Sequence, residues 1–327
     1  MIKVTDSLDI EKWSQFVHDD PHGTIFQTPE MCDVYKETKN YTPFHYFLLD
    51  DPDKLIAMMH GVFIRDTGSF LSHFTARSVI QGGPLYQSVD DIPELFEKYD
   101  EFIATKGVYT QIRNLWDTTL MKNSLQQAGY LYDEHLNFLI NLNRTEDKIW
   151  QDIHKNRRKG ISRAEKSGII IRKVERISEL DQSYDLIKST YSRVKMPIAD
   201  ISLFKSAFKQ LVPKGMADFY LALQDCEAVG TRIVLKYNGI VHDWYAGSKQ
   251  DAIYVDEALV WQILKDNAGK YNIFEFGGAG HPDKEYGVRE FKRRFGGTEV
   301  NYGRYQKVHS KIKKKMIEVG IRIKRTI

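Results

Sequence analysis

The sequence contains few cysteines and no long apolar run. Its two cysteines, Cys32 and Cys226, lie far apart and without the spacing of metal ligands, so neither a disulfide framework nor a zinc site is indicated. We expect no bound metal and no cofactor. No stretch approaches the roughly 20 apolar residues that a membrane span needs, and the first residues lack the apolar segment of a secretory signal. We therefore expect a soluble, cytoplasmic protein.

The sequence also lacks a strong excess of charge of either sign. The 327 residues carry a formal net charge of +3, which is too weak a global field to require a nucleic-acid partner, although local basic patches remain compatible with one. Hydrophobic residues make up 42% of the chain. A chain of this length and composition can bury the cores of two ordinary domains.

The first half of the chain predicts a mixture of helices and strands. Apolar periodicity predicts a helix at residues 8–17, a second helix that carries Met31, Val34 and Tyr35, a hairpin of strands at 44–49 and 55–64, and a helix at 93–105. A strand at 108–112, a helix at 120–128 and one long strand, "YLYDEHLNFLINL", follow. The order is therefore two helices, a hairpin, and then helix and strand in alternation.

The second half repeats this order. A long helix from Glu146 to Ser167 precedes the strand "IIIRKV", helices at 180–192 and 201–211, and three strands joined by the short turns "DCE" and "NG". A helix around residues 259–264, the strand "NIFEF" and a strand near "TEVNYGRY" complete it.

This element order is that of an N-acyltransferase (GNAT-like) fold used twice. We predict an α/β protein with mixed sheets and two tandem GNAT-like domains, residues 1–145 and 146–306. The basic C-terminal segment predicts an amphipathic helix at 307–327 that can complete the first domain, lie on the inner membrane surface or touch tRNA; docking on the first domain is our default.

The stretch "FEFGGAGHPDKEYGVREFKRRFGG" predicts a functional site. An apolar strand runs into Gly277 and Gly278, whose backbone can approach a ligand closely, and a short basic helix follows. The stretch contains neither a phosphate-binding P-loop nor a dinucleotide fingerprint. His281 has no metal partner at ligand spacing, so we expect it to be a loop residue.

Four segments resemble the Fem-type peptidyltransferases, which transfer amino acids from aminoacyl-tRNA to the stem peptide of a cell-wall precursor. They are "FEFGG" with "GVREFKRRFGG", "NRRKGISRAEKSGIIIRKV", "STYSRVKMP" and "FQTPEMCDVYKETKNY", and together they cover nearly the whole chain. The helical-hairpin arm of some members has no room here, because the basic helix leads directly into a strand. The segment "GSKQDAIYVDEA" stands where acetyl-CoA enzymes carry a pyrophosphate-binding loop, so aminoacyl-tRNA is the favoured donor.

The resemblance implies roles for several residues. Lys292, with Phe291 beside it, matches the lysine that meets the acyl end or the phosphates of the donor, although a solvated helix face is the simpler alternative. Lys36 and Arg193 match positions that hold the acceptor's phosphates, with ordinary surface charge as the alternative. From the residues themselves, Glu275 and Asp243 are candidate proton acceptors, because the attacking amine must lose a proton; either could instead face solvent or form a structural pair.

The basic residues of two helices are candidate tRNA contacts, because cations spread along a helix can follow a phosphate backbone. A solvated linker helix is the alternative for the first of them. The candidates are Arg157, Arg158, Arg163, Lys166, Arg293 and Arg294.

These features lead to one function and two alternatives. The favoured function is an acyltransferase that joins an aminoacyl group from tRNA to an amine of a nucleotide- or lipid-linked peptidoglycan precursor. The first alternative uses acyl-CoA as donor and an amine of a surface-polysaccharide pathway as acceptor. The second is a non-catalytic protein that binds tRNA or the precursor. The sequence specifies neither the transferred group nor the oligomeric state.

Overall fold

A computed structural model describes residues 3–50, 53–65, 76–104, 106 and 109–309. The chain forms two compact units. Unit 1 comprises Met1–Glu134 and Tyr302–Ile327, and unit 2 comprises His135–Asn301. The predicted C-terminal helix falls largely on residues 310–327, which lie outside the described residues; just before them, residues 304–308 form a strand.

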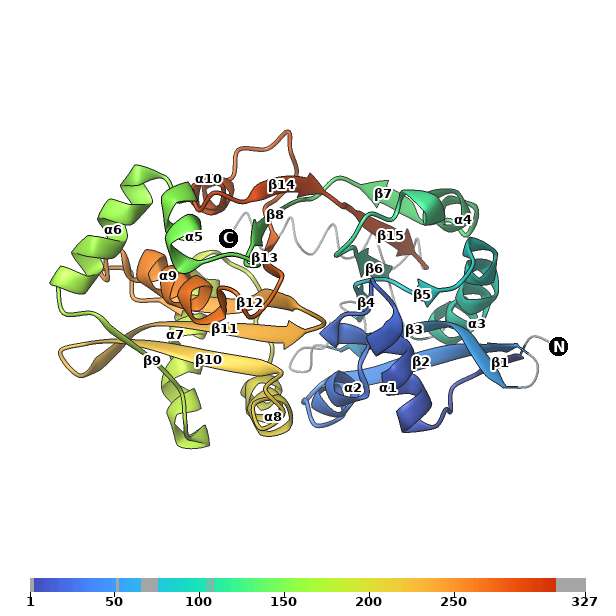
Figure 1. The fold of residues 1–327 in the computed structure, drawn as a ribbon. Helices are drawn as coiled ribbons and strands as arrows, with labels where there is room; N and C mark the ends of the chain where they lie inside the picture. The colour runs from blue at the N-terminus through green and yellow to red at the C-terminus, as the bar shows by residue number, and fades with distance from the viewer. Residues whose placement is uncertain (1–2, 51–52, 66–75, 105, 107–108, 310–327) are drawn as a thin grey trace, which may run out of the picture. The chain divides into compact units, whose positions relative to one another are not determined.

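Unit 1 contains one mixed sheet with helices packed on it (Figure 1). Its helices are α1 (Ile10–Asp19), α2 (Pro29–Lys36), α3 (Ile92–Ala104) and α4 (Lys122–Gln127). Its strands are β1 (Lys3–Thr5), β2 (Tyr41–Asp50), β3 (Lys54–Ile64), β4 (Arg77–Gln81), β5 (Leu85–Tyr86), β6 (Tyr109–Arg113), β7 (Leu131–Asp133) and β15 (Arg304–Val308).

Unit 2 contains a second mixed sheet and the remaining helices. The helices are α5 (Glu146–Asp152), α6 (Lys155–Lys166), α7 (Leu180–Arg193), α8 (Ile201–Leu211), α9 (Val255–Asn267) and α10 (Gly287–Arg293). The strands are β8 (Leu136–Asn141), β9 (Ile170–Lys173), β10 (Ala217–Gln224), β11 (Glu227–Tyr237), β12 (Ile240–Ser248), β13 (Ile273–Gly278) and β14 (Thr298–Asn301).

The two sheets have the same strand order. Unit 1 runs β1-β2-β3-β4-β6-β15-β7, with β5 paired to β3 outside this path, and unit 2 runs β9-β10-β11-β12-β13-β8-β14. In each sheet an antiparallel meander leads to one parallel pair, β4 with β6 or β12 with β13. In each sheet, too, the next strand comes from the other half of the sequence: β15 in unit 1 and β8 in unit 2. The predicted tandem GNAT-like fold is confirmed.

Helices cover both faces of the unit 2 sheet, and two glycines allow them to pack closely. A Cβ added to Gly230 would meet side chains of α9, whereas one added to Gly247 would meet the backbone of α7. Gly247 pairs with Thr231, the residue after Gly230. Because successive residues of a strand point to opposite faces, α9 and α7 lie on opposite faces of this sheet.

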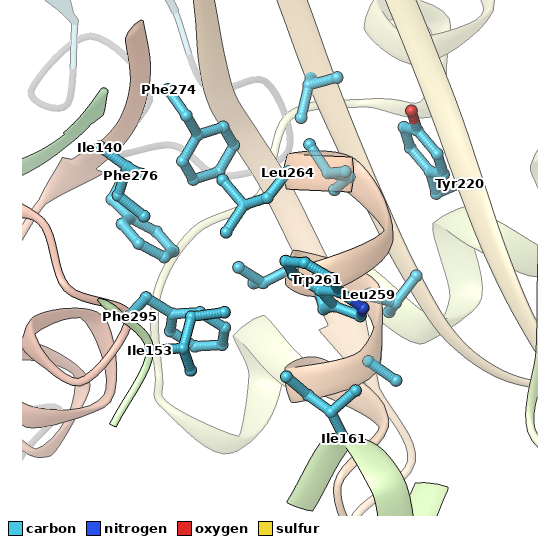
Figure 2. Close-up of a cluster of buried hydrophobic side chains, with 14 of the residues drawn as sticks. Ile140, Ile153, Ile161, Tyr220, Leu259, Trp261, Leu264, Phe274, Phe276 and Phe295 are labelled. Atoms are coloured by element: carbon cyan, nitrogen blue, oxygen red, sulfur yellow. The ribbon is translucent and has the colours of Figure 1, made fainter. Parts of the chain in front are cut away.

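The core of unit 2 lies between its sheet and helices α6 and α9. Figure 2 shows aromatic residues of β13 and the segment after α10 directed toward aliphatic residues of α9. Phe274, Phe276 and Phe295 are each at most 1% exposed. This packing fixes the end of β13 and the position of α10 from the apolar side, so the polar groups attached to them are held on a rigid frame.

Three sequence predictions differ from the observed elements. The strand predicted over residues 130–142 is two strands, β7 and β8, which belong to different sheets. The helix predicted from Glu146 to Ser167 is divided at Ile153 into α5 and α6. The strand predicted near residues 298–305 is likewise two strands, β14 and β15, in different sheets. From α6 the chain passes through Gly168 directly into β9.

Among the helices of the described residues, none is both long enough and apolar enough to cross a membrane.

Candidate functional site

The site in unit 2 forms where its two parallel strands separate. The β12–β13 ladder pairs Ile240–His242 with Ile273–Glu275 and ends there, although β12 continues to Ser248 and β13 to Gly278. The β11–β12 register also shifts between Ile233 and Val234. In open α/β sheets, ligands bind beyond the carboxyl ends of strands where neighbouring strands diverge. The structure brings Glu275, Asp243 and Lys292 together at this end of the sheet.

Glu275 is buried and both of its carboxylate oxygens have partners. Asn137 donates from Nδ2 to Oε1, His242 donates from Nδ1 to Oε2, and the backbone N–H of Gly277 donates to Oε1 at 3.2 Å. Burial alone would raise the pKa of Glu275, but the charge and hydrogen bonds of His242 and the hydrogen bond of Asn137 outweigh it and hold the pKa below its usual value. Glu275 therefore stays ionised and is poorly suited to accept a proton.

Asp243 is buried too, but only one of its oxygens is paired. Its Oδ2 lies 2.5 Å from a guanidinium nitrogen of Arg232, whereas Oδ1 is buried with no hydrogen-bond partner among the described residues. Burial raises the pKa of Asp243 above its usual value, and the charges of Arg232 and Lys292 oppose that rise only in part. A carboxylate with a free oxygen and a raised pKa has the properties of a general base.

Lys292 is fixed by the end of β13. Its ammonium group donates to the carbonyls of Phe276, Gly277 and Gly278 at 2.6, 3.3 and 3.0 Å, so each of its three protons has an acceptor. Burial lowers the pKa of Lys292 to about 8, against the raising effect of Asp243. Lys292 therefore holds the glycine loop in place and adds a positive charge to the cluster.

The glycine loop has a second clamp that sequence reasoning missed. Gly277 has φ of +69°, which a residue with a Cβ adopts only at a cost. Arg289, in α10, donates to the carbonyls of Ala279 at 3.1 Å and Pro282 at 2.9 Å, and also to that of His281. The backbone after β13 is therefore held by Lys292 on one side and Arg289 on the other.

The predicted tRNA-binding residues of α6 differ in their contacts and in their exposure. The Arg157 guanidinium lies 2.5 Å from Glu257 and 4.4 Å from the centre of the Phe291 ring, so it links α6, α9 and α10. Arg163 is exposed and donates to the hydroxyl of Tyr254 at 2.8 Å. Arg158 is half-buried, and Lys166 is exposed.

The remaining predicted site residues lie at the surface. Arg293 pairs with Glu290 and Glu299, and Arg294 pairs with Glu290. Arg193, at the end of α7 in unit 2, donates to the carbonyl of Ser248 at 2.8 Å.

Lys36 is the one predicted site residue in unit 1, where it ends α2. It pairs with Asp33 at 3.0 Å, and this hydrogen bond raises its pKa.

Residues 122–252 match the model of the FemAB family. The chain has the GNAT fold, and its central segment is similar to the FemAB family. The resemblance to Fem-type proteins seen in the sequence motifs is thereby confirmed as a similarity of that segment and of the fold. A search of curated proteins finds no match.

Solved structures share the fold of this chain along nearly its whole length. The structure of FemX is 12% identical, has a TM-score of 0.70 and covers 94% of this chain and 97% of its own. A tandem GNAT protein from the clavulanic acid biosynthesis pathway is 8% identical, with a TM-score of 0.62 and coverage of 95% and 99%. L-PGS from Bacillus licheniformis is 16% identical, with a TM-score of 0.57 and coverage of 99% of both chains.

Sequence reasoning did not identify several partners in this candidate site. His242, Arg232 and Asn137 each lie on a mostly apolar strand, and each pairs with a candidate carboxylate. The available signal was a charged or polar residue inside an apolar strand, because such a residue needs a buried partner. The sequence does not show which carboxylate that partner is, since this depends on the register between strands.

Unit 1 contains a pocket of about 430 Å³. Two cationic side chains lie over aromatic rings that line the pocket. Lys106 Nζ lies 4.0 Å from the centre of the Phe102 ring, and Arg65 Cζ lies 5.7 Å from the centre of the Phe63 ring. The lining residues are Asn40, Tyr41, Thr42, Phe63, Arg65, Phe102 and Lys106. Paired cations and aromatic rings suit an anionic ligand with a flat ring.

Proposed function

We propose that the protein is an aminoacyltransferase that forms an amide on an amine of a nucleotide- or lipid-linked peptidoglycan precursor, with aminoacyl-tRNA as donor. The observation that carries the proposal is the cluster of Asp243, Lys292 and Glu275 at the point where β12 and β13 separate. The Fem-type family match and the similarity to FemX support it.

The reaction assigns a role to each of the three groups. The acceptor amine attacks the ester carbon of the donor, a C–N bond forms, and the C–O bond to the tRNA ribose breaks. The free Oδ1 of Asp243 takes the proton that the amine loses, and this proton then passes to the departing ribose oxygen. Lys292 places its charge where negative charge develops on the carbonyl oxygen, and Glu275 keeps His242 and the glycine loop in position.

The first turn of α9 favours tRNA over acyl-CoA as donor. In GNAT-fold proteins this helix begins where a coenzyme diphosphate would be held, and helix N-termini ordinarily attract phosphate. Here the first turn carries Asp256 and Glu257. Asp256 bonds to Ser248 and Glu257 pairs with Arg157. Two carboxylates at this helix start repel a diphosphate, which argues against the acyl-CoA alternative.

The donor surface that we propose is the outer side of α6 together with the basic end of α10. Arg158, Arg163 and Lys166 would contact the tRNA backbone, and Arg293 and Arg294 would contribute if they exchange their carboxylate partners for phosphates. Arg157 would act indirectly, by holding Phe291 beside Lys292.

Lys36 in unit 1 and Arg193 in unit 2 are each proposed as a separate contact to a phosphate of the acceptor. Each has a long cationic side chain at the C-terminal end of a helix, α2 for Lys36 and α7 for Arg193. The pocket lined by Arg65 and Lys106 is an additional place for the nucleotide or diphosphate of the precursor.

The test compares donors in a transfer assay and in binding at two salt concentrations. Wild-type protein is expected to bind aminoacyl-tRNA more tightly than uncharged tRNA, with an affinity that falls steeply with salt, and to transfer its amino acid. The double variant Arg158→Ala/Lys166→Ala should weaken binding and flatten the salt dependence. The double variant Lys188→Ala/Lys209→Ala makes the same charge change at exposed residues of α7 and α8 and should have little effect.

Three results would contradict the proposal. Saturable acyl-CoA binding with only weak, charge-independent tRNA binding would favour the coenzyme as donor. Tight binding of tRNA or precursor without any transfer would indicate the non-catalytic alternative. A folded Lys292→Ala protein that transfers at the wild-type rate would exclude Lys292 from the reaction.

A further inference from the structure

One cysteine and two histidines form a cluster in unit 1 in which Cys32 and His60 are buried and His45 is half-buried. His45 on β2 and His60 on β3 are direct cross-strand partners, so their side chains project from the same face of the sheet. Helix α2 packs on β2 and carries Cys32. One ligand atom from each of the three residues lies within 4.8 Å of the others.

One nitrogen of His60 is left available to the cluster, and one nitrogen of His45 faces the Cys32 sulfur. His60 Nδ1 lies 2.7 Å from the carbonyl of Phe26 and must donate to it, so Nε2 carries the lone pair. His60 is fully buried, and this Nε2 has no hydrogen-bond partner among the described residues. His45 has a backbone hydrogen bond to Asp6, and its Nδ1 lies 3.9 Å from the Cys32 sulfur.

We propose that Cys32, His45 and His60 bind a transition-metal ion, with Zn²⁺ as the expected occupant. Metal-bound histidines almost always donate their second ring N–H to a carbonyl, a carboxylate or water, and the bond of His60 to Phe26 has this form. Zn–N and Zn–S bonds of roughly 2.0 and 2.3 Å place ligand atoms about 3 to 4 Å apart, so small side-chain rotations suffice. One sulfur and two imidazoles form a ligand set that binds Zn²⁺ in preference to Mg²⁺ or Ca²⁺.

The alternative use of a cysteine beside a histidine is nucleophilic catalysis, and burial argues against it. Cys32 is 1% exposed and His60 is not exposed. Trp13 lies over both histidines, with ring centres 4.9 Å from His45 and 5.6 Å from His60. A substrate cannot reach the sulfur, whereas a metal ion bound as the unit folds can.

A metal at this position would join α2 to the sheet. Cys32 lies one helical turn before Lys36, which ends α2, so the ion would fix the end of the helix that carries a proposed phosphate-binding residue. The metal proposal does not depend on that role. It depends on the ligand geometry alone and can be tested without any assay of transfer.

The probe is Co²⁺ added to full-length protein stripped of metal, because cobalt bound through a thiolate gives a sulfur-to-metal charge-transfer absorption. Wild-type protein should show this band at one equivalent of Co²⁺, and one equivalent of Zn²⁺ should abolish it. Cys226→Ser is the matched control: Cys226 is exposed and lies in unit 2, so this variant should retain the band. Cys32→Ser should lose the band, and His60→Gln should weaken metal binding by at least tenfold.

The control variant keeps the test decisive even if Cys32→Ser does not fold. In the Cys226→Ser protein, Cys32 is the sole thiol, so any thiolate band must come from it. Absence of the band in that protein, or a band in wild type that Cys226→Ser removes, would overturn the proposal. Metal binding that persists in a folded Cys32→Ser protein would overturn it as well.

Discussion

The two units have the same strand order but differ at their parallel strand pair. In unit 1 the pair of β4 and β6 remains in register along all five residues of both strands, from Arg77 with Tyr109 to Gln81 with Arg113. In unit 2 the corresponding pair separates after three residues. An unbroken ladder satisfies its own backbone groups, whereas separated strands leave groups that loops, side chains or a ligand must satisfy.

The polar groups buried beside these strands differ in the same way. Unit 1 has hydroxyl groups there and a partly exposed ion pair: Tyr99 bonds to Thr110, which also lies 2.8 Å from His309, and Lys307 pairs with Asp100. Unit 2 has ionic groups, with Asp243 paired to Arg232 and a buried Lys292 close by. The comparison shows that one topology can place hydroxyl groups and a partly exposed ion pair beside its parallel strands in one copy and a buried ionic cluster in the other.

The strongest test of this difference is to neutralise Asp243. The variant Asp243→Asn keeps the size of the side chain but cannot accept a proton, so the transfer rate is expected to fall by about 10²- to 10⁴-fold. The rate is measured with saturating donor and acceptor, and thermal unfolding checks that the variant is folded. A folded variant with the wild-type rate would remove Asp243 from the mechanism.

A second test uses the dependence of stability on pH. The pKa of Lys292 is lowered from 10.5 to about 8, so between these values the unfolded chain binds more protons than the folded one. The contribution of Lys292 to the free energy of unfolding should therefore rise with pH, by about 3 kcal/mol between pH 8 and 10.5. Urea unfolding of wild type and Lys292→Met at both ends of this range measures it as a difference in slope. Parallel slopes would contradict the buried position of the lysine.

The smallest expected effect is in unit 1. Replacing Tyr99 by Phe removes its hydrogen bond to Thr110 but leaves the ring packed against Phe44. The free energy of unfolding should fall by about 1 kcal/mol, and the transfer rate should not change. A large loss of transfer in this variant would show that the hydrogen bond between Tyr99 and Thr110 also matters for the reaction.

The sequence predicts much of the fold because its signals are local. The hairpin of β2 and β3, the meander of β10 to β12 and most helices follow from apolar periodicity and short turns. The repeated order of elements predicts the tandem arrangement. The sequence also predicts a candidate site in the segment after β13, because paired glycines next to a basic helix have no simple role in a core.

The remaining features depend on contacts between distant residues. The apolar pattern of residues 130–142 does not reveal that β7 and β8 enter different sheets, because both strands have ordinary strand sequences. Asp243 and Glu275 are equivalent candidates in the sequence, and only the positions of Arg232, His242 and Asn137 distinguish them. The pair His45 and His60 likewise becomes visible only when the hairpin register is known.

The exchange of β8 and β15 between the two halves of the sequence has a consequence for synthesis. β15 lies inside the unit 1 sheet, between β6 and β7, yet it is the last strand of the described chain to leave the ribosome. The unit 1 sheet therefore cannot close until the chain has been made as far as β15. Unit 2, whose strands β8 to β14 are consecutive in the sequence, can complete its sheet first. We therefore expect unit 2 to fold before unit 1 during synthesis.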